Sequence, residues 1–356
     1  MREGVTRRSV VSALGCLGLG AIAGGRGLAV SRGEGGATPK TPRDDRLAGS
    51  FWYKKGDGRL YTVAGGTGQP IAVNRILGNY PLSSSAFVVS RFGPRYLQLT
   101  QTAVIPSRAV INVYDHTDHR PYCHINVEGF VVGAAVSPSG KYVMFRRSPD
   151  YPQSLFGEGP QIQIVDLVII DISDVDNIRA VRNTRTQKGA AVYGVQWLAG
   201  DRFVYMTWGD RLYGDSLYLG SVAGGSADDR LLGRIDKQGL RIARFNVHPD
   251  ESSMLLSLFD RDGSTLGVWD VYAYTLKGQP IDRVTATGQG YGGIWSPDGN
   301  YIYFQYGNGN TCYGARCTAT CSAHVIASSQ RSVSLAATRE LDGAKVPCFW
   351  GPAWRG

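Results

Sequence analysis

The stretch Trp295-Ser296-Pro297-Asp298-Gly299, followed by the alternating residues Tyr301-Ile302-Tyr303-Phe304, decides the fold. Proline presets φ at a central turn position and glycine accepts a positive φ, so the pattern predicts a tight turn between two β-strands. Related turns at residues 137, 197, 248 and 296 are 60, 51 and 48 residues apart. The further copies are Val136-Ser137-Pro138-Ser139-Gly140, Trp197-Leu198-Ala199-Gly200, Val247-His248-Pro249-Asp250-Glu251 and, more weakly, Phe92-Gly93-Pro94-Arg95.

A period of about 40–50 residues with four short strands per unit is typical of a β-propeller blade. We therefore predict an all-β fold, a six-bladed β-propeller, with seven blades as the alternative. Five segments each hold about four strands, namely residues 84–127, 130–183, 190–233, 240–287 and 290–342.

The sixth blade is split between the two ends of the chain. Residues 51–77 hold only its outer strands, and Cys348-Phe349-Trp350-Gly351-Pro352 mirrors the inner strand Gly293-Ile294-Trp295-Ser296-Pro297. We expect the N- and C-terminal strands to pair and close the ring, because closure removes an exposed sheet edge that invites aggregation.

With these turns, two further segments resemble the TolB-like β-propeller family. They are Leu60-Tyr61-Thr62-Val63-Ala64-Gly65-Gly66 and Leu217-Tyr218-Leu219-Gly220-Ser221-Val222-Ala223-Gly224-Gly225. The resemblance covers about residues 51–356 and implies a propeller with a periplasmic interaction role. It does not carry over a partner, because residues 24–50 are too short and polar to form the family's N-terminal domain.

The composition describes a folded, basic protein. Hydrophobic residues make up 43% and aromatic residues 10% of the 356 residues, which excludes intrinsic disorder. The formal charge of +9 indicates either an ordinary solvated surface or an anionic partner. No basic cluster accompanies this charge, so we do not expect nucleic acid as a partner.

The N-terminus reads as an export signal. Thr6-Arg7-Arg8-Ser9-Val10-Val11 resembles a twin-arginine motif, and Ala21-Ile22-Ala23 resembles a cleavage site. An ordinary secretory signal and lipidation at Cys16 are the alternatives. We predict a signal peptide over 1–23, a polar disordered linker over 24–50 and a propeller over 51–356. No later apolar run approaches the roughly 18 residues that span a bilayer, so we expect a periplasmic or secreted protein.

Two long insertions point to a binding face. In a four-stranded blade, the loops between the second and third strands share one face with the crossovers between blades. Residues 146–161 and 307–322 rise on that face, and long loops on a rigid scaffold are common binding sites. Loops that only cap the ring are the alternative. The expected aromatic and basic contacts are Tyr151, Phe156, Tyr213, Tyr291, Tyr313, Arg146, Arg147, Arg211 and Arg316.

Four cysteines near the C-terminus are disulfide candidates, because an exported chain favours disulfides. They are Cys312, Cys317, Cys321 and Cys348. We expect one bridge to join Cys348 to the loop that holds the other three, and a second bridge within that loop, with the pairing left open. Together with His324, the first three resemble a metal knuckle, but the spacing lacks a C-x2-C pair.

A second cluster holds His116, His119 and His124. Imidazoles at such short range could bind a divalent metal. The segment falls in a connection between the third and fourth strands of a blade, away from the central channel. We therefore expect a polar turn with surface histidines and predict no cofactor, with a divalent metal as the less favoured alternative.

These features favour an exported, non-enzymatic protein that binds an envelope protein or an anionic polymer through its loop face. The sequence contains no G-x-S-x-G, Walker or H-E-x-x-H motif. The alternative is a metal-dependent lyase or hydrolase that acts on an acidic saccharide in the channel, since the turns also resemble those of oligogalacturonate lyases. Those enzymes use histidines in the channel, where neither His248 nor His324 is expected here. No oligomeric state is predicted.

Overall fold

The structure is a computed structural model of the chain. It describes residues 50–54, 60–64, 71–72, 85–89, 93–101, 108–148, 166–184, 191–208, 215–225, 228–235, 240–259, 269–307, 320–341, 346–347 and 353–355. The chain divides into two units, residues 1–40 and 41–356, and every described residue belongs to the second. The predicted signal peptide and all but the last residue of the predicted linker lie outside the described residues. Over the residues described, no helix is long and apolar enough to cross a membrane.

The described residues form an all-β fold of six antiparallel sheets, numbered here in chain order. Sheet 1 combines both ends of the second unit, in the order β25 (Ala353–Arg355), β1 (Ser50–Lys54), β2 (Leu60–Ala64) and β3 (Ile71–Ala72). Sheet 2 contains β4 (Ser85–Val89), β5 (Arg95–Gln101), β6 (Arg108–Asp115) and β7 (Pro121–Glu128). Sheet 3 contains β8 (Phe130–Val136), β9 (Tyr142–Ser148), β10 (Asp166–Asp171) and β11 (Arg179–Thr184).

The remaining sheets repeat this order. Sheet 4 contains β12 (Ala191–Trp197), β13 (Arg202–Trp208), β14 (Asp215–Ser221) and β15 (Arg230–Ile235). Sheet 5 contains β16 (Arg241–Val247), β17 (Ser253–Phe259), β18 (Trp269–Thr275) and β19 (Pro280–Arg283). Sheet 6 contains β20 (Gly290–Trp295), β21 (Tyr301–Tyr306), β22 (Thr320–Ala327) and β23 (Arg339–Glu340), and β24 (Val346–Pro347) also pairs with β22. The two short 3-10 turns of the described part are η2 (Ala199–Asp201) and η5 (Leu335–Ala337).

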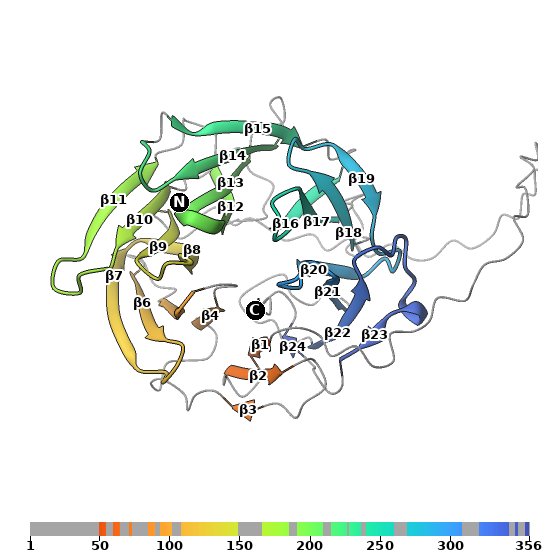
Figure 1. The fold of residues 1–356 in the computed structure, drawn as a ribbon, viewed down its shortest axis with the longest axis horizontal. Coiled ribbons are helices and arrows are strands. Elements are labelled where there is room, and N and C mark those ends of the chain that lie inside the picture. Colours follow the sequence, from red (N-terminus) through yellow and green to blue (C-terminus); the bar gives the residue numbers. More distant parts are fainter. Residues whose placement is uncertain are drawn as a thin grey trace, which may run out of the picture. The chain divides into compact units, whose positions relative to one another are not determined.

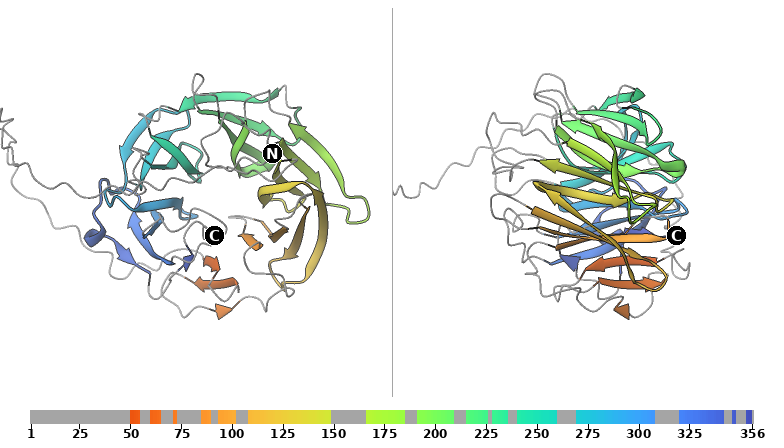
Figure 2. Two further views of the ribbon diagram at one scale, coloured as in Figure 1. Left: turned by 180° about the vertical axis from the view of Figure 1, so that it is seen from behind. Right: turned by 90° about the vertical axis from the view of Figure 1, so that its left-hand side faces the viewer.

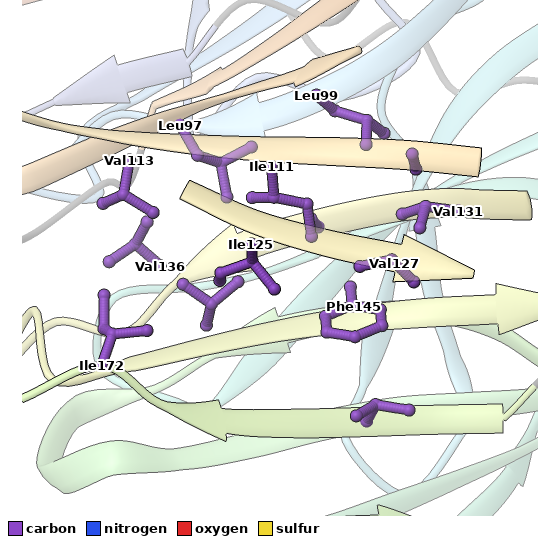
Figure 3. Packing of buried hydrophobic residues seen from close by; sticks show 14 residues of the cluster. Leu97, Leu99, Ile111, Val113, Ile125, Val127, Val131, Val136, Phe145 and Ile172 are labelled. Carbon is purple, nitrogen blue, oxygen red and sulfur yellow. The ribbon is translucent and has the colours of Figure 1, made fainter. Parts of the chain in front are cut away.

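Within the second unit the sheets follow one another in chain order around a common centre, with β4, β8, β12, β16 and β20 innermost in sheets 2 to 6 (Figure 1). The view from behind shows the same order (Figure 2). Packing between neighbouring sheets is apolar. Figure 3 shows the cluster between sheets 2 and 3, in which Leu97 and Ile111 of sheet 2 meet Phe145 of sheet 3. Comparable clusters join sheets 3 and 4, 4 and 5, and 5 and 6.

The turns between first and second strands have the geometry that their residues predict. In sheet 6 the Gly299 N–H donates to the carbonyl of Ser296 at 3.0 Å, and Gly299 has a φ of 76°. In sheet 3 the Gly140 N–H donates to the carbonyl of Ser137 at 2.9 Å, with a φ of 73°. In sheet 5, Glu251 takes the glycine position with a φ of 61°.

The inner strands of sheets 3 to 6 are bulged at corresponding places, a feature that the repeat did not predict. The register shifts lie between Val131 and Gly133, Val192 and Gly194, Ile242 and Arg244, and Tyr291 and Ile294. Glycine at the bulges of sheets 3, 4 and 6 permits close packing: a Cβ on Gly194 would lie 2.5 Å from Cε1 of Phe245 in the next sheet. The bulges therefore increase local twist while keeping neighbouring inner strands close.

Candidate functional site

The end of β9 and the start of β10 bring four polar residues together at one edge of sheet 3. These residues, Arg146, Arg147, Ser148 and Asp166, are called here the loop end of sheet 3. The connection between the two strands, residues 149–165, is the longest between the second and third strands of any sheet. Arg146 and Arg147 were both expected on the binding face.

Successive residues of a strand point to opposite faces, so the two arginines diverge. Arg146 lies opposite Gly133 of the inner strand, and a Cβ on Gly133 would lie 3.0 Å from Nη2 of Arg146. The missing side chain of Gly133 therefore leaves room for the Arg146 guanidinium over the inner strand. Its neighbours on the same face, Met144 and Leu167, belong to the cluster between sheets 3 and 4.

Arg147 faces sheet 2 and lies opposite Asp166 in the register of β9 and β10. Nη2 of Arg147 is 3.7 Å from Oδ2 of Asp166, and the two side chains are 34% and 10% exposed. This separation exceeds the 2.7–3.2 Å of an N–H···O hydrogen bond, so the contact is an ion pair only. Oδ1 of Asp166 is buried and has no hydrogen-bond partner. On the opposite face, the buried Oγ of Ser148 has none either.

The corresponding position of sheet 5 provides an internal comparison. Val143 in sheet 3 and Met254 in sheet 5 are equivalent, because each pairs with the last residue of its inner strand. Arg147 and Leu258 stand four residues after these two positions, so they are equivalent as well. Asp166 lies opposite Arg147, and Asp270 lies opposite Leu258. The two aspartates therefore occupy the same place in the repeat.

The Asp270 carboxylate is saturated. Its Oδ1 accepts hydrogen bonds from Oγ1 of Thr285 at 2.8 Å and from the Thr287 N–H at 2.9 Å, and Arg283 pairs with Oδ2. Thr285 and Thr287 lie in the crossover from sheet 5 to sheet 6, so Asp270 holds this crossover in place. Asp166 makes none of these contacts. Asp270 is thus a structural aspartate, whereas Asp166 keeps an oxygen, Oδ1, that accepts no hydrogen bond.

Tyr291 was expected on the binding face, but it is buried, with 2% of its surface exposed. It lies on the inner strand β20, and its hydroxyl is 2.6 Å from Sγ of Cys321. Its ring also contacts that of Trp269 in sheet 5, so it lies within the packing of the sheets. The other expected contacts lie outside the described residues: Tyr151, Phe156, Tyr213, Tyr313, Arg211 and Arg316.

Cys321 is disulfide-bonded. Cys312, Cys317 and Cys348 lie outside the described residues. β24 pairs with β22 so that Pro347 lies opposite Thr320, which brings the backbone next to Cys348 close to the start of β22. A metal knuckle through Cys321 and His324 does not fit this geometry, because the Cys321 sulfur is already in a disulfide bond.

His324 is also engaged. Its ring nitrogens lie 2.7 Å from Oγ of Ser322 and 2.8 Å from Oγ1 of Thr338, and the ring stacks on Phe304. Burial lowers the pKa of His324, and Glu340 opposes this shift. The residue therefore serves as a neutral, hydrogen-bonded part of sheet 6.

The histidine cluster differs from the expected surface turn. His116 and His119 are half-buried, with ring centroids 4.7 Å and 6.4 Å from that of Trp52 on β1 of the neighbouring sheet. Burial lowers the pKa of His119, and Asp118 opposes this shift. His124 is exposed on β7. Within the described part of the chain, no group of three or more His, Cys, Asp or Glu residues could hold a metal ion.

Polar residues on the inner strands, which the sequence did not single out, tie successive sheets together. Oε1 of Gln196 accepts a hydrogen bond from the Val247 N–H at 2.8 Å, and Oδ1 of Asn246 accepts one from the Trp295 N–H at 2.9 Å. Gln196 and Asn246 are both the second-to-last residue of an inner strand, so an alignment of the repeats could have found them. Asp166 was missed because the long insertion before it hides its register with β9.

Comparisons with known proteins show the fold and leave the function open. No family model matches the chain, and no curated protein matches it. TolB from Acinetobacter baumannii is 13% identical, with a TM-score of 0.50, and the match covers 88% of this chain and 68% of that one.

Two further solved structures score lower. An oligogalacturonate lyase in complex with manganese is 12% identical over 72% of this chain and 74% of its own, with a TM-score of 0.46. The β-propeller domain of the Trilobed protease from Pyrococcus furiosus is 9% identical over 70% and 71%, with a TM-score of 0.40. The chain thus has a TolB-like propeller fold, a fold that hosts unrelated functions.

Proposed function

We propose that the chain is an exported, non-enzymatic six-bladed propeller that binds an anionic ligand of the cell envelope through its loop face. The observation that carries this proposal is the loop end of sheet 3. Arg146 and Arg147 lie there side by side in sequence, at the edge from which the longest strand connection leaves. The formal charge of +9 falls to +7 without residues 1–23, which hold three arginines and one glutamate, and the remaining positive charge adds a long-range attraction for anions.

The strand pairing of sheet 1 supports six blades and a closed ring. β25 pairs with β1 in an antiparallel register, with Trp354 opposite Phe51. β25 also contacts β20 of sheet 6 and β4 of sheet 2, as an inner strand between those sheets would. The two ends of the second unit would then complete one blade, and β25 would cover the edge of β1.

Export is supported by the twin-arginine-like motif and by the disulfide at Cys321, since disulfides persist in oxidising compartments. The TolB-like fold agrees with the periplasmic role that the family resemblance implies. We place the mature protein in the periplasm or outside the cell.

The alternative, a metal-dependent lyase or hydrolase in the channel, has less support among the described residues. His324 is held by two hydroxyl groups, and His248 lies in a turn beside Asp250. Gln196 and Asn246 on the inner strands are engaged with neighbouring backbones. These side chains are therefore occupied by structural contacts.

One titration separates the two functions. Polygalacturonate, a polymer that is both an anion and a substrate for saccharide lyases, would be added to the mature protein with and without manganese, and both binding and polymer length would be measured. We expect binding with unchanged polymer length under both conditions. Shortening of the polymer would support the enzyme, and absence of binding would overturn the proposed function.

A further inference from the structure

Arg147 and Asp166 are paired in a way that leaves both with unused hydrogen-bonding capacity. Their closest atoms are 3.7 Å apart, which is too long for a hydrogen bond. Oδ1 of Asp166 has no partner, although the residue is only 7% exposed. A buried acceptor without a donor costs stability, so a residue that persists in this state calls for an explanation.

A comparison within the molecule shows a satisfied aspartate at the corresponding position. Asp270 occupies the same place in sheet 5, is 1% exposed and is fully hydrogen-bonded by the crossover. The repeat can therefore satisfy an aspartate at this position without a ligand. In sheet 3 the cross-strand neighbour is Arg147 instead of Leu258, and the carboxylate keeps one oxygen unused.

We propose that Arg147 and Asp166 form a two-part subsite that binds an anionic group and a hydroxyl group of the same ligand. The inference rests on the proposed function and names the chemistry of its ligand. The guanidinium of Arg147 would donate to the anionic group, and Oδ1 of Asp166 would accept from the hydroxyl. The ligand is thus an anionic polymer whose repeating unit carries a hydroxyl beside its carboxylate.

The charges around the subsite favour this ligand over others. A cationic group directed at Asp166 would also meet the positive charge of Arg147, so a neutral donor fits better. An anion without a hydroxyl would pair with Arg147 but would approach the Asp166 carboxylate, which repels it. The two residues together therefore select for the hydroxyl as well as for the negative charge.

The test compares two polycarboxylates of similar length, polyglucuronate, which carries hydroxyl groups, and polyacrylate, which does not. Affinities would be measured for the mature protein and for Asp166→Ala and Asp166→Asn. We expect the wild type to prefer polyglucuronate. In Asp166→Ala the affinity for polyglucuronate falls about tenfold or more, as for the loss of a hydrogen bond to a charged group, and that for polyacrylate rises.

Asp270→Ala is the matched control. It removes an aspartate from the same place in the repeat, so it should lower stability and leave the preference for polyglucuronate unchanged in the folded fraction. Asp166→Ala should fold at least as stably as the wild type, because it removes an unsatisfied buried group. Asp166→Asn provides a variant of almost equal volume.

The outcomes separate the two proposals. Binding of neither polymer by the wild type overturns the proposed function. Equal binding of both polymers, unchanged in Asp166→Ala, leaves the proposed function standing and overturns the subsite. Tighter binding of polyglutamate than of polyglucuronate would also overturn it, because the ligand would then be an acidic peptide.

Discussion

The guanidinium of Arg182 and the carboxylate of Asp229 form an ion pair between sheets 3 and 4, with the two side chains 3% and 4% exposed. Arg182 also donates to the carbonyls of Ser221 at 2.9 Å and Gly224 at 3.1 Å. The Tyr205 hydroxyl donates to Asp229 at 2.7 Å, and burial together with this carboxylate raises the pKa of Tyr205. Arg182 thus connects β11, the outer strand of sheet 3, to Ser221, Gly224 and Asp229 of sheet 4.

Replacing Arg182 with alanine should lower the free energy of unfolding by about 3–5 kcal/mol, because the Asp229 charge would stay buried without its partner. Urea unfolding of the variant measures this loss. Arg179→Ala is the control, since Arg179 is exposed on the same strand and should change stability by less than about 0.5 kcal/mol. Equal effects of the two substitutions would contradict the assignment of the buried pair.

Substitution of two glycines with positive φ distinguishes the cost of backbone strain from the cost of a steric clash. Gly278 has a φ of 84°, and a Cβ there would lie 2.1 Å from the carbonyl oxygen of Arg234. Gly200 has a φ of 67° and open space around the Cβ position. Gly200→Ala should lower the free energy of unfolding by about 1–2 kcal/mol, because alanine is strained in the left-handed region. Gly278→Ala carries the same strain and adds about 1–3 kcal/mol from the clash, so its loss should be roughly 2–5 kcal/mol.

Thermal unfolding of the two variants gives the comparison. Similar melting temperatures would mean that the turn of sheet 5 does not pack against β15 as described. In that case the contact between sheets 4 and 5 at this edge would need revision.

The seam between sheets 1 and 2 should weaken in mild acid. Burial lowers the pKa of His119 below 6.5, so the unfolded chain binds more protons than the folded chain just below this pH. The stabilisation is complete above pH 6.5 and is lost as the pH falls toward the lowered pKa of the folded state. His324 contributes in the same direction, because burial also lowers its pKa.

The measurement is the urea midpoint at pH about 7.5 and about 5, a range in which histidine changes charge and exposed carboxylates stay ionised. His119→Asn is the test variant, because asparagine tolerates the φ of 59° that His119 adopts. We expect the variant to lose less stability than the wild type between the two pH values. An identical loss would show that His119 does not titrate on unfolding.

The disulfide at Cys321 should hold the end of the chain to sheet 6. We propose Cys348 as its partner, because β24 ends one residue before Cys348 and pairs with the start of β22. Cys348→Ser should then lower the stability by about 2–4 kcal/mol, and a reductant should lower that of the wild type equally.

Cys123→Ser is the control for the disulfide. Cys123 is a free, half-buried cysteine, and burial raises the pKa of its thiol to about 11. Its replacement should leave the response to reductant unchanged. Cys348→Ser with wild-type stability would contradict the pairing and would leave Cys312 and Cys317 as candidate partners.

The sequence predicts the repeat well because proline and glycine act locally. The turn at Ser296 and its copies place the strands, and the apolar run that follows this turn, Ile302, Tyr303 and Phe304, is fully buried. The mirrored segment 348–352, predicted as the inner strand of sheet 1, lies outside the described residues. The strand that pairs with β1 is β25, which follows this segment.

The side chains of the site were harder to predict because their positions depend on register. Tyr291 is buried next to a bulge in β20, and strand alternation alone reveals neither the bulge nor the burial. His116 and His119 pack on Trp52, which is more than sixty residues away in sequence. The difference between Asp166 and Asp270 lies in their hydrogen-bond partners, and only the folded chain provides these.

The most direct test of the account is the affinity of the mature protein for polyglucuronate after charge reversal at the loop end of sheet 3. Arg146→Glu/Arg147→Glu would be compared with Arg179→Glu/Arg230→Glu, which makes the same change in net charge at exposed positions on the outer strands. We predict a loss of about a hundredfold or more for the first pair and a much smaller loss for the second. Equal losses would mean that the net charge, and not this site, binds the polymer.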